Sequence, residues 1–401
     1  MTIKVLDAIC GQGKTTKVLS NIEELPLNVK VIYVTPLITE CERVIEHFSN
    51  SKCGRKFVMP LVMDSSGSKM LNLLTLLKSG GNIATTHALF RNLTPEHLEL
   101  IYELGYNLVL DEVLTVVETF KELKGLRYTV NHIKELVEEG VMVLDSDDCT
   151  LRWDSSKLRA DESFYKSLKD LCAVGSLLII EDKCVLWSLP VDVLKVFNEI
   201  TICTYMFESS DMAAYLKYHG MSYEVNSFGV LPSEFKDFID IFDRDTLNNI
   251  GDKNSALSAS KIRLNEGGCV PALKKCLYNY FNHHNKGVKS DRKLWTGYKS
   301  KEHQLKGLGY ATRFLACNTK ATNEYGNTKV LAYTCNIHHQ PYIAKFYKAK
   351  GIKLNQDLYA LSEMLQWLWR SQIRNNKPIK VYIPSSRMRN LLKAWLEDTY
   401  I

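Results

Sequence analysis

The sequence lacks any run of about 18 consecutive apolar residues, the length that a membrane-spanning helix requires. Its first ten residues, MTIKVLDAIC, have neither the basic start nor the long apolar core of a signal peptide. None of its 11 cysteines forms a Cys-X-X-Cys pair, and no group of cysteines and histidines has the spacing of a zinc site. We therefore expect a cytoplasmic protein with reduced thiols, without a membrane segment or a disulfide framework.

The chain has 401 residues, of which 45% are hydrophobic and 24% are charged, and this composition is typical of a globular protein. The length is enough for about two domains. Charge is unevenly distributed, because residues 285–401 hold 21 Lys and Arg against 7 Asp and Glu, whereas residues 1–284 hold 30 against 38. The basic C-terminal third indicates a polyanionic partner such as nucleic acid.

Short apolar strands alternate with helices along the first 110 residues. Strands are expected at 3–7, 30–35, 56–63, 82–85 and 107–110, with helices at 14–22, 39–48, 69–78 and 95–104. This alternation predicts an α/β fold with a parallel sheet that helices cover on both faces. Residues 121–197 interrupt the rhythm with two expected hairpins, at 141–153 and 177–189, and are interpreted as an insertion. A strand at 200–207 then completes a first lobe.

The α/β pattern resumes in the second half of the chain, after a polar stretch. The expected elements there are strands at 293–296, 313–316, 330–333 and 379–383, a helix at 270–283 and one long helix at Leu358–Arg374. The sequence therefore predicts two α/β lobes, residues 1–210, which include the insertion, and residues 211–401, which are basic.

The segment 8–16, AICGQGKTT, lies between the first strand and the first helix. It fits the phosphate-binding P-loop except that Ala8 takes the place of the first glycine. Glycine at two positions allows the backbone N–H groups to face phosphate oxygens, at the positive end of the following helix. Lys14 is expected to reach the β- and γ-phosphates of ATP, and Thr15 to coordinate Mg²⁺. The expected cofactor-binding residues are Gly11, Gln12, Gly13, Lys14, Thr15 and Thr16.

The strand at 107–110 ends at two adjacent carboxylates, Asp111 and Glu112. An acidic pair at the end of an apolar strand, about 100 residues after a P-loop, is typical of a nucleotide-hydrolysing site. We expect Asp111 to hold Mg²⁺, and Glu112 to orient and deprotonate the attacking water.

Together with the P-loop, Asp111-Glu112-Val113-Leu114 resembles the DEAD/DEAH-like superfamily 2 helicases, in particular phage-encoded members. The resemblance implies two RecA-like lobes with ATP and Mg²⁺ in the cleft and a nucleic-acid strand across both lobes. Thr35-Pro36-Leu37 resembles the family's motif Ia, and Thr85-Thr86-His87 resembles the next element that contacts the nucleic-acid backbone. Thr204-Tyr205-Met206 stands where the family has a Ser-Ala-Thr coupling motif, from which it departs in chemistry.

The second lobe resembles the same family in several segments. Residues 365–374, LQWLWRSQIR, resemble motif VI, and the expected helix would carry Gln366, Arg370 and Arg374 on roughly one face. An arginine from this lobe would stabilise charge on the γ-phosphate in the transition state. Trp369 replaces the family's usual small residue, and Arg374 falls one residue late. Residues 318–325 resemble motif V, and the strand at 293–296 corresponds to motif IV.

The resemblance assigns two sets of site residues. The implied catalytic residues are Lys14, Glu112, Gln366, Arg370 and Arg374. The implied nucleic-acid contacts are Thr35, Pro36, Thr85, Thr86, His87, Thr296, Thr319, Lys320, Thr322 and Asn323.

We therefore expect an ATP-dependent helicase or translocase that acts on DNA rather than RNA in phage replication or recombination, in the bacterial host cytoplasm. Two alternatives stay open: a DNA-packaging-type ATPase, and an ATP-gated nucleic-acid clamp without unwinding. Packaging would need a nuclease, and the spacing of the acidic cluster at 237–245 does not place paired acids at separate strand ends. A small-molecule P-loop kinase would not explain the basic C-terminal third. The adjacent histidine pairs at 283–284 and 338–339 point apart on a helix or strand, so no metal is expected there.

Overall fold

The computed structural model describes residues 1–62, 68–120, 128–145, 149–157, 162–181, 183–319 and 324–400. The chain splits into two compact units. The first comprises Met1–Leu6, Thr15–Asn226 and Gln340–Leu354, and the second comprises Asp7–Lys14, Ser227–His339 and Asn355–Ile401. The division into lobes at 1–210 and 211–401 stays a prediction.

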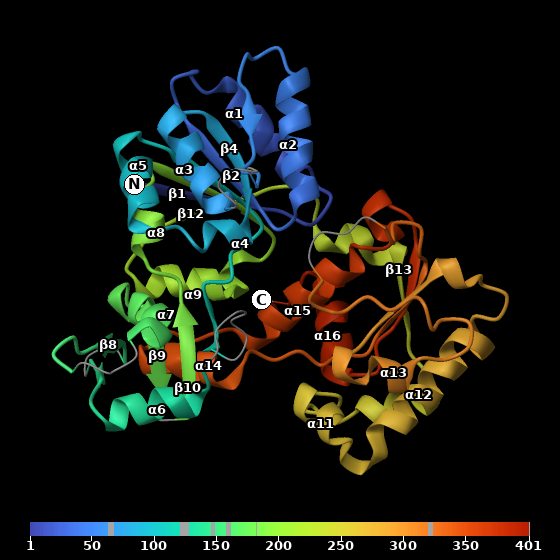
Figure 1. The fold of residues 1–401 in the computed structure, drawn as a ribbon. Helices are drawn as coiled ribbons and strands as arrows, with labels where there is room; N and C mark the ends of the chain where they lie inside the picture. Colours follow the sequence, from blue (N-terminus) through green and yellow to red (C-terminus); the bar gives the residue numbers. More distant parts are fainter. Residues whose placement is uncertain are drawn as a thin grey trace. The chain divides into compact units, whose positions relative to one another are not determined.

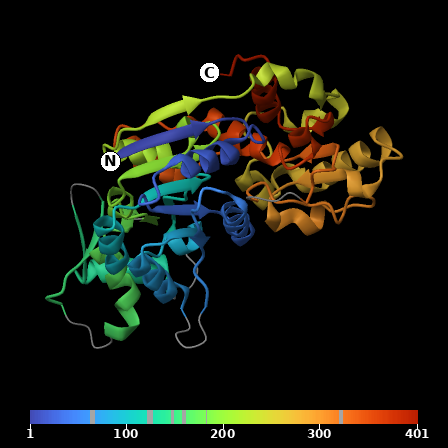
Figure 2. The same cartoon turned by 90° about the horizontal axis from the view of Figure 1, so that it is seen from above.

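A seven-stranded sheet forms the centre of the first unit. In spatial order its strands are β12 (Glu224–Ser227), β1 (Thr2–Asp7), β11 (Glu199–Thr204), β5 (Asn107–Asp111), β2 (Val31–Thr35), β4 (Asn82–Thr86) and β3 (Phe57–Val58). The pairs from β11 to β3 are parallel. The N–H of Thr2 donates to the carbonyl of Asn198 at 3.3 Å, so β1 and β11 start at the same edge. Figure 2 shows the blue β1 beside the yellow-green β12.

Helices cover this sheet because its central strands are apolar on both faces. All five residues of β2, VIYVT, are buried, which is the pattern of an interior parallel strand. The helices of this part are α1 (Lys14–Glu24), α2 (Ile38–Asn50), α3 (Lys69–Ser79), α4 (His87–Phe90), α5 (Pro95–Glu103), α8 (Asp192–Lys195) and α9 (Asp211–Tyr218). Helices α1 and α2 lie side by side (Figure 1), each burying one apolar stripe.

Most of the described part of the segment 121–197, interpreted as an insertion, forms a small subdomain together with β6, and the subdomain has a core cluster of its own. Its elements are β6 (Val117–Thr119), α6 (Val130–Glu138), β7 (Met142–Leu144), β8 (Leu151–Trp153), α7 (Glu162–Ala173), β9 (Leu177–Ile180) and β10 (Cys184–Ser188). Both predicted hairpins are confirmed as antiparallel pairs, β7 with β8 and β9 with β10. The predicted turn at 146–148 lies outside the described residues.

A helix within residues 340–354 packs in the first unit, although the segments on both sides of it belong to the second unit. Helix α14 (Pro341–Ala349) lies against β6 and β9 of the subdomain (Figure 1). Its Ile343, Phe346 and Tyr347 are buried in the same core cluster as Leu178 and Ile180. The sequence analysis predicted no element here.

The second unit contains a four-stranded parallel sheet. In spatial order its strands are β13 (Ile239–Phe242), β16 (Ile379–Tyr382), β15 (Val330–Tyr333) and β14 (Lys293–Thr296). Its α-helices are α10 (Asp245–Asn248), α11 (Ala259–Leu264), α12 (Cys269–Asn279), α13 (Glu302–Leu305), α15 (Gln356–Leu368) and α16 (Ser386–Leu396). No helix in the described part of the chain is both long and apolar enough to cross a membrane.

The predicted helix at Leu358–Arg374 is wrong in its second part. Helix α15 ends at Leu368, and a separate 3-10 turn covers Gln372–Asn375. Trp369 is 3% exposed and packs against Phe235 and Trp395, with ring centroids 5.0 and 5.6 Å away. The helix ends where Trp369 packs into this core. The backbone at Ser371 is extended (φ −87°, ψ −171°), so α15 cannot continue into the 3-10 turn. Gln366, Arg370 and Arg374 therefore do not share one helix face.

Three predicted strands differ from the structure. The strand expected at 313–316 forms an isolated bridge, in which Phe314 pairs with Trp295, because the chain turns away on both sides of it. The strand expected at 56–63 is limited to Phe57–Val58, and position 63 lies outside the described residues. The strand expected at 200–207 ends at Thr204, and Met206 then adopts a left-handed conformation with φ 57°.

Candidate functional site

Five predicted motif segments end or directly follow strands of the first sheet. The strands from β11 to β4 are parallel, and β1 starts beside β11, so the carboxyl ends of all five strands meet at the same edge. The segments that follow or end these strands are the P-loop after β1, Thr204-Tyr205-Met206 after β11, Asp111-Glu112 after β5, Thr35-Pro36 after β2 and Thr85-Thr86-His87 after β4. Ligands of open parallel sheets bind at this edge.

The P-loop has the backbone that phosphate binding requires. Gly11 and Gly13 have φ values of 83° and 81°, which side chains with a Cβ rarely adopt. A Cβ placed on Gly13 would meet no atom within 4 Å, so the loop faces open space there. Helix α1 begins at Lys14, and the ammonium group of this lysine donates to the carbonyls of Ala8 at 2.6 Å and Ile9 at 3.3 Å. These features fit a phosphate group held by the loop and the helix N-terminus.

Asp111 ends β5 and is held by a buried tyrosine. The hydroxyl of Tyr33, in the middle of β2, donates to Oδ2 of Asp111 at 3.1 Å. Burial and the neighbouring Glu112 carboxylate raise the pKa of Asp111 to about 6, while the bond from Tyr33 opposes this rise. Burial and the charge of Asp111 also raise the pKa of Tyr33 well above its ordinary value, so Tyr33 remains a hydrogen-bond donor.

Glu112 has an unusual backbone conformation. Its φ is 80°, in the left-handed region that favours glycine. Its N–H donates to the carbonyl of Cys203 at 2.9 Å, across from β5 to β11. Left-handed non-glycine residues concentrate at functional sites, where the surrounding structure compensates for their strain. Glu112 is therefore joined by its backbone to the residue that precedes Thr204.

The donors at this edge fit a divalent cation with oxygen ligands. The carboxylates of Asp111 and Glu112 are adjacent, and a nearby cation would relieve the repulsion that raises the pKa of Asp111. The hydroxyl of Thr35 is buried and has no hydrogen-bond partner among the described residues, and Thr35 follows Val34, which pairs with Leu110. Carboxylate and hydroxyl oxygens of this kind hold Mg²⁺ directly or through water. Among the described residues, no group of three or more His, Cys, Asp or Glu side chains could hold a metal ion, so these two carboxylates would bind a cation together with hydroxyl, water or phosphate oxygens.

The predicted nucleic-acid contacts of the first unit differ in accessibility. Thr35 is 0% exposed and Thr85 is 3% exposed. Pro36, Thr86 and His87 are half-buried. The hydroxyl of Thr86 accepts from the N–H of Leu89 and caps α4. An external strand that reached these segments would therefore meet Pro36, Thr86 and His87 before the two buried threonines.

The three predicted catalytic residues of the second unit lie in different structural elements. Gln366 lies in α15 and its amide donates to Ser362 at 3.3 Å. Arg370 lies in the turn after α15, and its Nε is buried without a hydrogen-bond partner in the described part of the chain. Arg374 lies in the next 3-10 turn. Whether the arginines act on a nucleotide at the first sheet stays a prediction.

The predicted motif IV and V residues are described only in part. Thr296 ends β14 and is 0% exposed. Thr319 is half-buried, and its N–H donates to the carbonyl of Ala316 at 3.1 Å. Lys320, Thr322 and Asn323 lie outside the described residues. Their nucleic-acid role stays a prediction.

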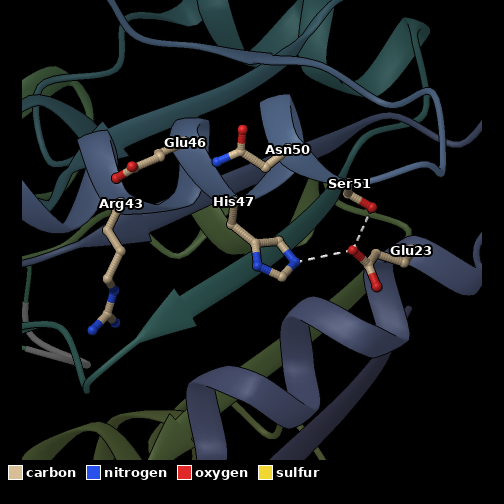
Figure 3. Close-up of a pocket in the computed structure, with 6 residues that line it drawn as sticks. All are labelled: Glu23, Arg43, Glu46, His47, Asn50 and Ser51. Atoms are coloured by element: carbon tan, nitrogen blue, oxygen red, sulfur yellow. Dashed lines mark hydrogen bonds and ion pairs between the residues drawn. The ribbon is translucent and has the colours of Figure 1, made fainter.

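A hollow lies between α1 and α2 (Figure 3), with a volume of about 380 Å³. Its lining residues are Glu23, Arg43, Glu46, His47, Asn50 and Ser51. Glu23 accepts from Ser51 at 2.6 Å and pairs with His47 at 3.0 Å, so the polar groups on this side satisfy each other. Arg43 pairs with Glu40 at 2.6 Å. No ligand chemistry follows from this hollow.

Sequence reasoning missed Tyr33 as a residue of the site. Within the strand KVIYVT it reads as one of several β-forming residues. Its contact with Asp111 depends on the register of β2 against β5, in which Tyr33 pairs with Val109. A polar aromatic residue in a fully buried strand was the available signal, since its hydroxyl must find a partner.

Comparison with known proteins gives the family. Residues 233–396 match the family model "YonV C-terminal Rossmann-like domain". The "SPbeta prophage-derived uncharacterized protein YonV" of Bacillus subtilis (strain 168) is 34% identical over 420 residues, which cover 99% of each chain.

Among solved structures, "XPD_Helicase" superposes with a TM-score of 0.52 at 12% identity and covers 99% of this chain and 95% of that chain. The "DUF1998 helicase MrfA bound to DNA" covers 99% of this chain and 46% of that chain, with 10% identity and a TM-score of 0.36. The first likeness agrees with the α/β fold and parallel sheets predicted from the sequence. Because 34% of the aligned residues are identical and the alignment covers 99% of both chains, this chain belongs to the same family as its Bacillus relative, the YonV family.

Proposed function

We propose that this protein is an ATP-dependent helicase or translocase that moves along nucleic acid. The observation that carries the proposal is that a P-loop follows β1 and the pair Asp111-Glu112 stands at the end of β5, two strands of one sheet. A P-loop alone is compatible with many nucleotide-binding proteins, but an added carboxylate base is typical of those that hydrolyse the nucleotide. The fold likeness to a helicase supports the choice of a motor.

Each residue at the edge has a proposed role. Lys14 would exchange its bonds to the carbonyls of Ala8 and Ile9 for bonds to the β- and γ-phosphates. Thr15 and Asp111 would hold Mg²⁺, which when bound neutralises phosphate charge. Glu112 would orient the attacking water and accept its proton.

We further propose that Arg370 acts from the second unit, with Gln366 and Arg374 as less direct contributors. A guanidinium group at the nucleotide would stabilise the charge that develops on the γ-phosphate in the transition state. The Nε of Arg370, which is buried and has no hydrogen-bond partner among the residues that the structure describes, supports the choice of this arginine. Arg374 is a weaker candidate because it lies in a separate 3-10 turn.

DNA is the proposed nucleic acid, and phage replication or recombination is the proposed setting. The basic surplus of residues 285–401 supports a polyanionic partner, and the relative from a prophage supports the setting. A packaging motor is less well supported, because Asp243 pairs with Lys393 at 2.6 Å and Asp240 pairs with Lys380 at 3.3 Å. Two of the four acids of the cluster at 237–245 are thus paired with lysines, which favours a structural role for them over a nuclease centre.

The test is the rate of ATP hydrolysis with single-stranded DNA, duplex DNA, RNA or no nucleic acid. We expect single-stranded DNA to raise the rate at least several-fold, and Lys14→Ala and Glu112→Gln to reduce it to background. Lys157→Ala is the matched control, because Lys157 also donates to a backbone carbonyl, that of Glu139 at 3.3 Å, but lies in the subdomain. A rate that no nucleic acid changes would contradict the motor. If ATP-dependent DNA binding persisted in that case, an ATP-gated nucleic-acid clamp would replace the motor as the proposed function.

A further inference from the structure

Tyr33 occupies a position where its hydroxyl has few choices of partner. It is the central residue of β2, the whole strand is buried, and the Tyr33 side chain is 0% exposed. A buried phenol needs a hydrogen-bond acceptor, since an unmet hydroxyl costs free energy. The acceptor here is Oδ2 of Asp111, at 3.1 Å.

The sheet register explains why this pair forms. Tyr33 lies opposite Val109 on the neighbouring parallel strand β5. Side chains alternate between the two faces of a strand, so Val109 and Asp111 point to the same face, and this is also the face of Tyr33. The tyrosine thus reaches diagonally along β5 to the carboxylate at its end.

We propose that Tyr33 is a positioning residue for Asp111 as a metal ligand, an inference that rests on the proposed function. The hydroxyl occupies one lone pair of Oδ2 and fixes the rotation of the carboxylate, so that the remaining oxygen lone pairs stay available to Mg²⁺. Mg²⁺ demands near-ideal octahedral geometry, and a carboxylate that rotates freely satisfies this demand less often. Hydrogen-bonded partners of metal ligands commonly contribute 10- to 100-fold to metal affinity.

A matched control exists in the same unit. Tyr106 is also 0% exposed, and its hydroxyl donates to the carbonyl of Gly81 at 2.9 Å. Tyr106 directly precedes β5 and therefore lies at the amino end of the strand whose carboxyl end carries Asp111. Tyr33→Phe and Tyr106→Phe each remove one buried hydroxyl and its hydrogen bond. A difference between them in metal binding cannot come from the loss of a buried hydroxyl as such.

The experiment measures Mn²⁺ binding by electron paramagnetic resonance, with a non-hydrolysable ATP analogue present, for the full-length wild type, Tyr33→Phe, Tyr106→Phe and Asp111→Asn. Nucleotide binding without metal is measured in parallel in EDTA, and thermal unfolding reports folding. We expect Tyr33→Phe to raise the apparent Kd for Mn²⁺ about 10-fold while its metal-free nucleotide affinity stays unchanged. Tyr106→Phe should bind Mn²⁺ like the wild type.

Three results would overturn the inference, and the first of them does so without contradicting the proposed function. If Asp111→Asn loses Mn²⁺ binding but Tyr33→Phe retains wild-type affinity, Asp111 is a metal ligand that needs no help from Tyr33. If Asp111→Asn itself binds Mn²⁺ as tightly as the wild type, the proposed metal site and the role of Tyr33 fail together. A folded Tyr33→Phe variant whose metal-free nucleotide binding falls as much as its Mn²⁺ binding would indicate general damage and would also contradict the inference.

Discussion

Nζ of Lys345 lies 2.6 Å from Oε2 of Glu181, across 164 residues of sequence. The pair joins α14 to the turn between β9 and β10, and both side chains are about half exposed. Beneath it, Phe346 and Tyr347 of the same helix are buried. The docking of α14 therefore combines an exposed ion pair with a buried apolar face.

The apolar face should dominate the attachment of α14. We expect Phe346→Ala to lower the free energy of unfolding by about 3–5 kcal/mol, because Phe346 is 2% exposed and contacts Tyr218 at a ring-centroid distance of 5.2 Å. Lys345→Ala should change it little, since water and salt screen an exposed pair. Urea denaturation of both variants compares the two effects. Equal losses for the two variants would contradict this division.

The left-handed backbone conformation of Glu112 should lower the free energy of unfolding, and glycine at this position should raise it again. Glycine adopts φ 80° without strain, so we expect Glu112→Gly to raise the free energy of unfolding by about 1 kcal/mol while ATP hydrolysis is lost. Glu112→Gln should lose hydrolysis without this gain, because glutamine keeps the Cβ. Thermal unfolding in the absence of nucleotide measures the difference. A glycine variant no more stable than the glutamine variant would show that the backbone is not strained.

Acid should destabilise the first unit through His219. Burial, and then the charge of Lys195, lower the pKa of His219 to about 4, and the ring packs against Tyr215 at 4.4 Å and Tyr218 at 4.7 Å. The unfolded histidine titrates near 6.5, so between about pH 6.5 and 4 the unfolded state binds more protons and stability falls as pH falls. His219→Gln should flatten this part of the profile. Stability curves against pH for the two proteins that run parallel would exclude His219 as the cause.

Substitutions of the neighbouring residues Trp369 and Arg370 should have different effects, the first on stability and the second on ATP hydrolysis. We expect Trp369→Ala to lower the free energy of unfolding by about 3–5 kcal/mol, because it empties a site between Phe235 and Trp395. Arg370→Ala should leave stability nearly unchanged and reduce nucleic-acid-stimulated ATP hydrolysis at least tenfold if its guanidinium acts on the nucleotide. Calorimetry and steady-state kinetics of both variants test this. Normal hydrolysis by folded Arg370→Ala would remove this arginine from the mechanism.

Local patterns predicted the central strands of the first sheet well, whereas β12 was not expected and β3 and β11 are shorter than expected. Strands such as VIYVT and NLVLD are apolar runs bounded by polar or turn residues, and the structure places them within about one residue of the expected bounds. The helix at Leu358–Arg374 failed because nothing in its local sequence opposes a helix. Its end coincides with Trp369 entering a core formed by residues distant in sequence. Helix α14 was missed although its local sequence has helix signals, namely Pro341 at its first position, Gln340 as its N-cap and apolar residues at positions 343, 346 and 347.

The residues of the candidate site also differ in whether the local sequence is enough to identify them. The P-loop and the acidic pair are contiguous motifs, so the order of residues along the chain is enough to identify them. The hydrogen bond from Tyr33 to Asp111 depends on strand register, and the burial of Thr35 and Thr85 depends on the helices that cover the sheet. Pattern reasoning named these two threonines as external contacts because motif position does not report exposure.

The return of the chain to the first unit through Gln340–Leu354 also limits how the protein can be dissected. A fragment truncated after Asn226 would lack α14 and leave the apolar side of β6 and β9 bare, which favours aggregation. A soluble N-terminal half would therefore need residues 340–354 supplied as a fused or added peptide. The complementary fragment would carry an orphaned helix with three large apolar side chains and no surface to receive them.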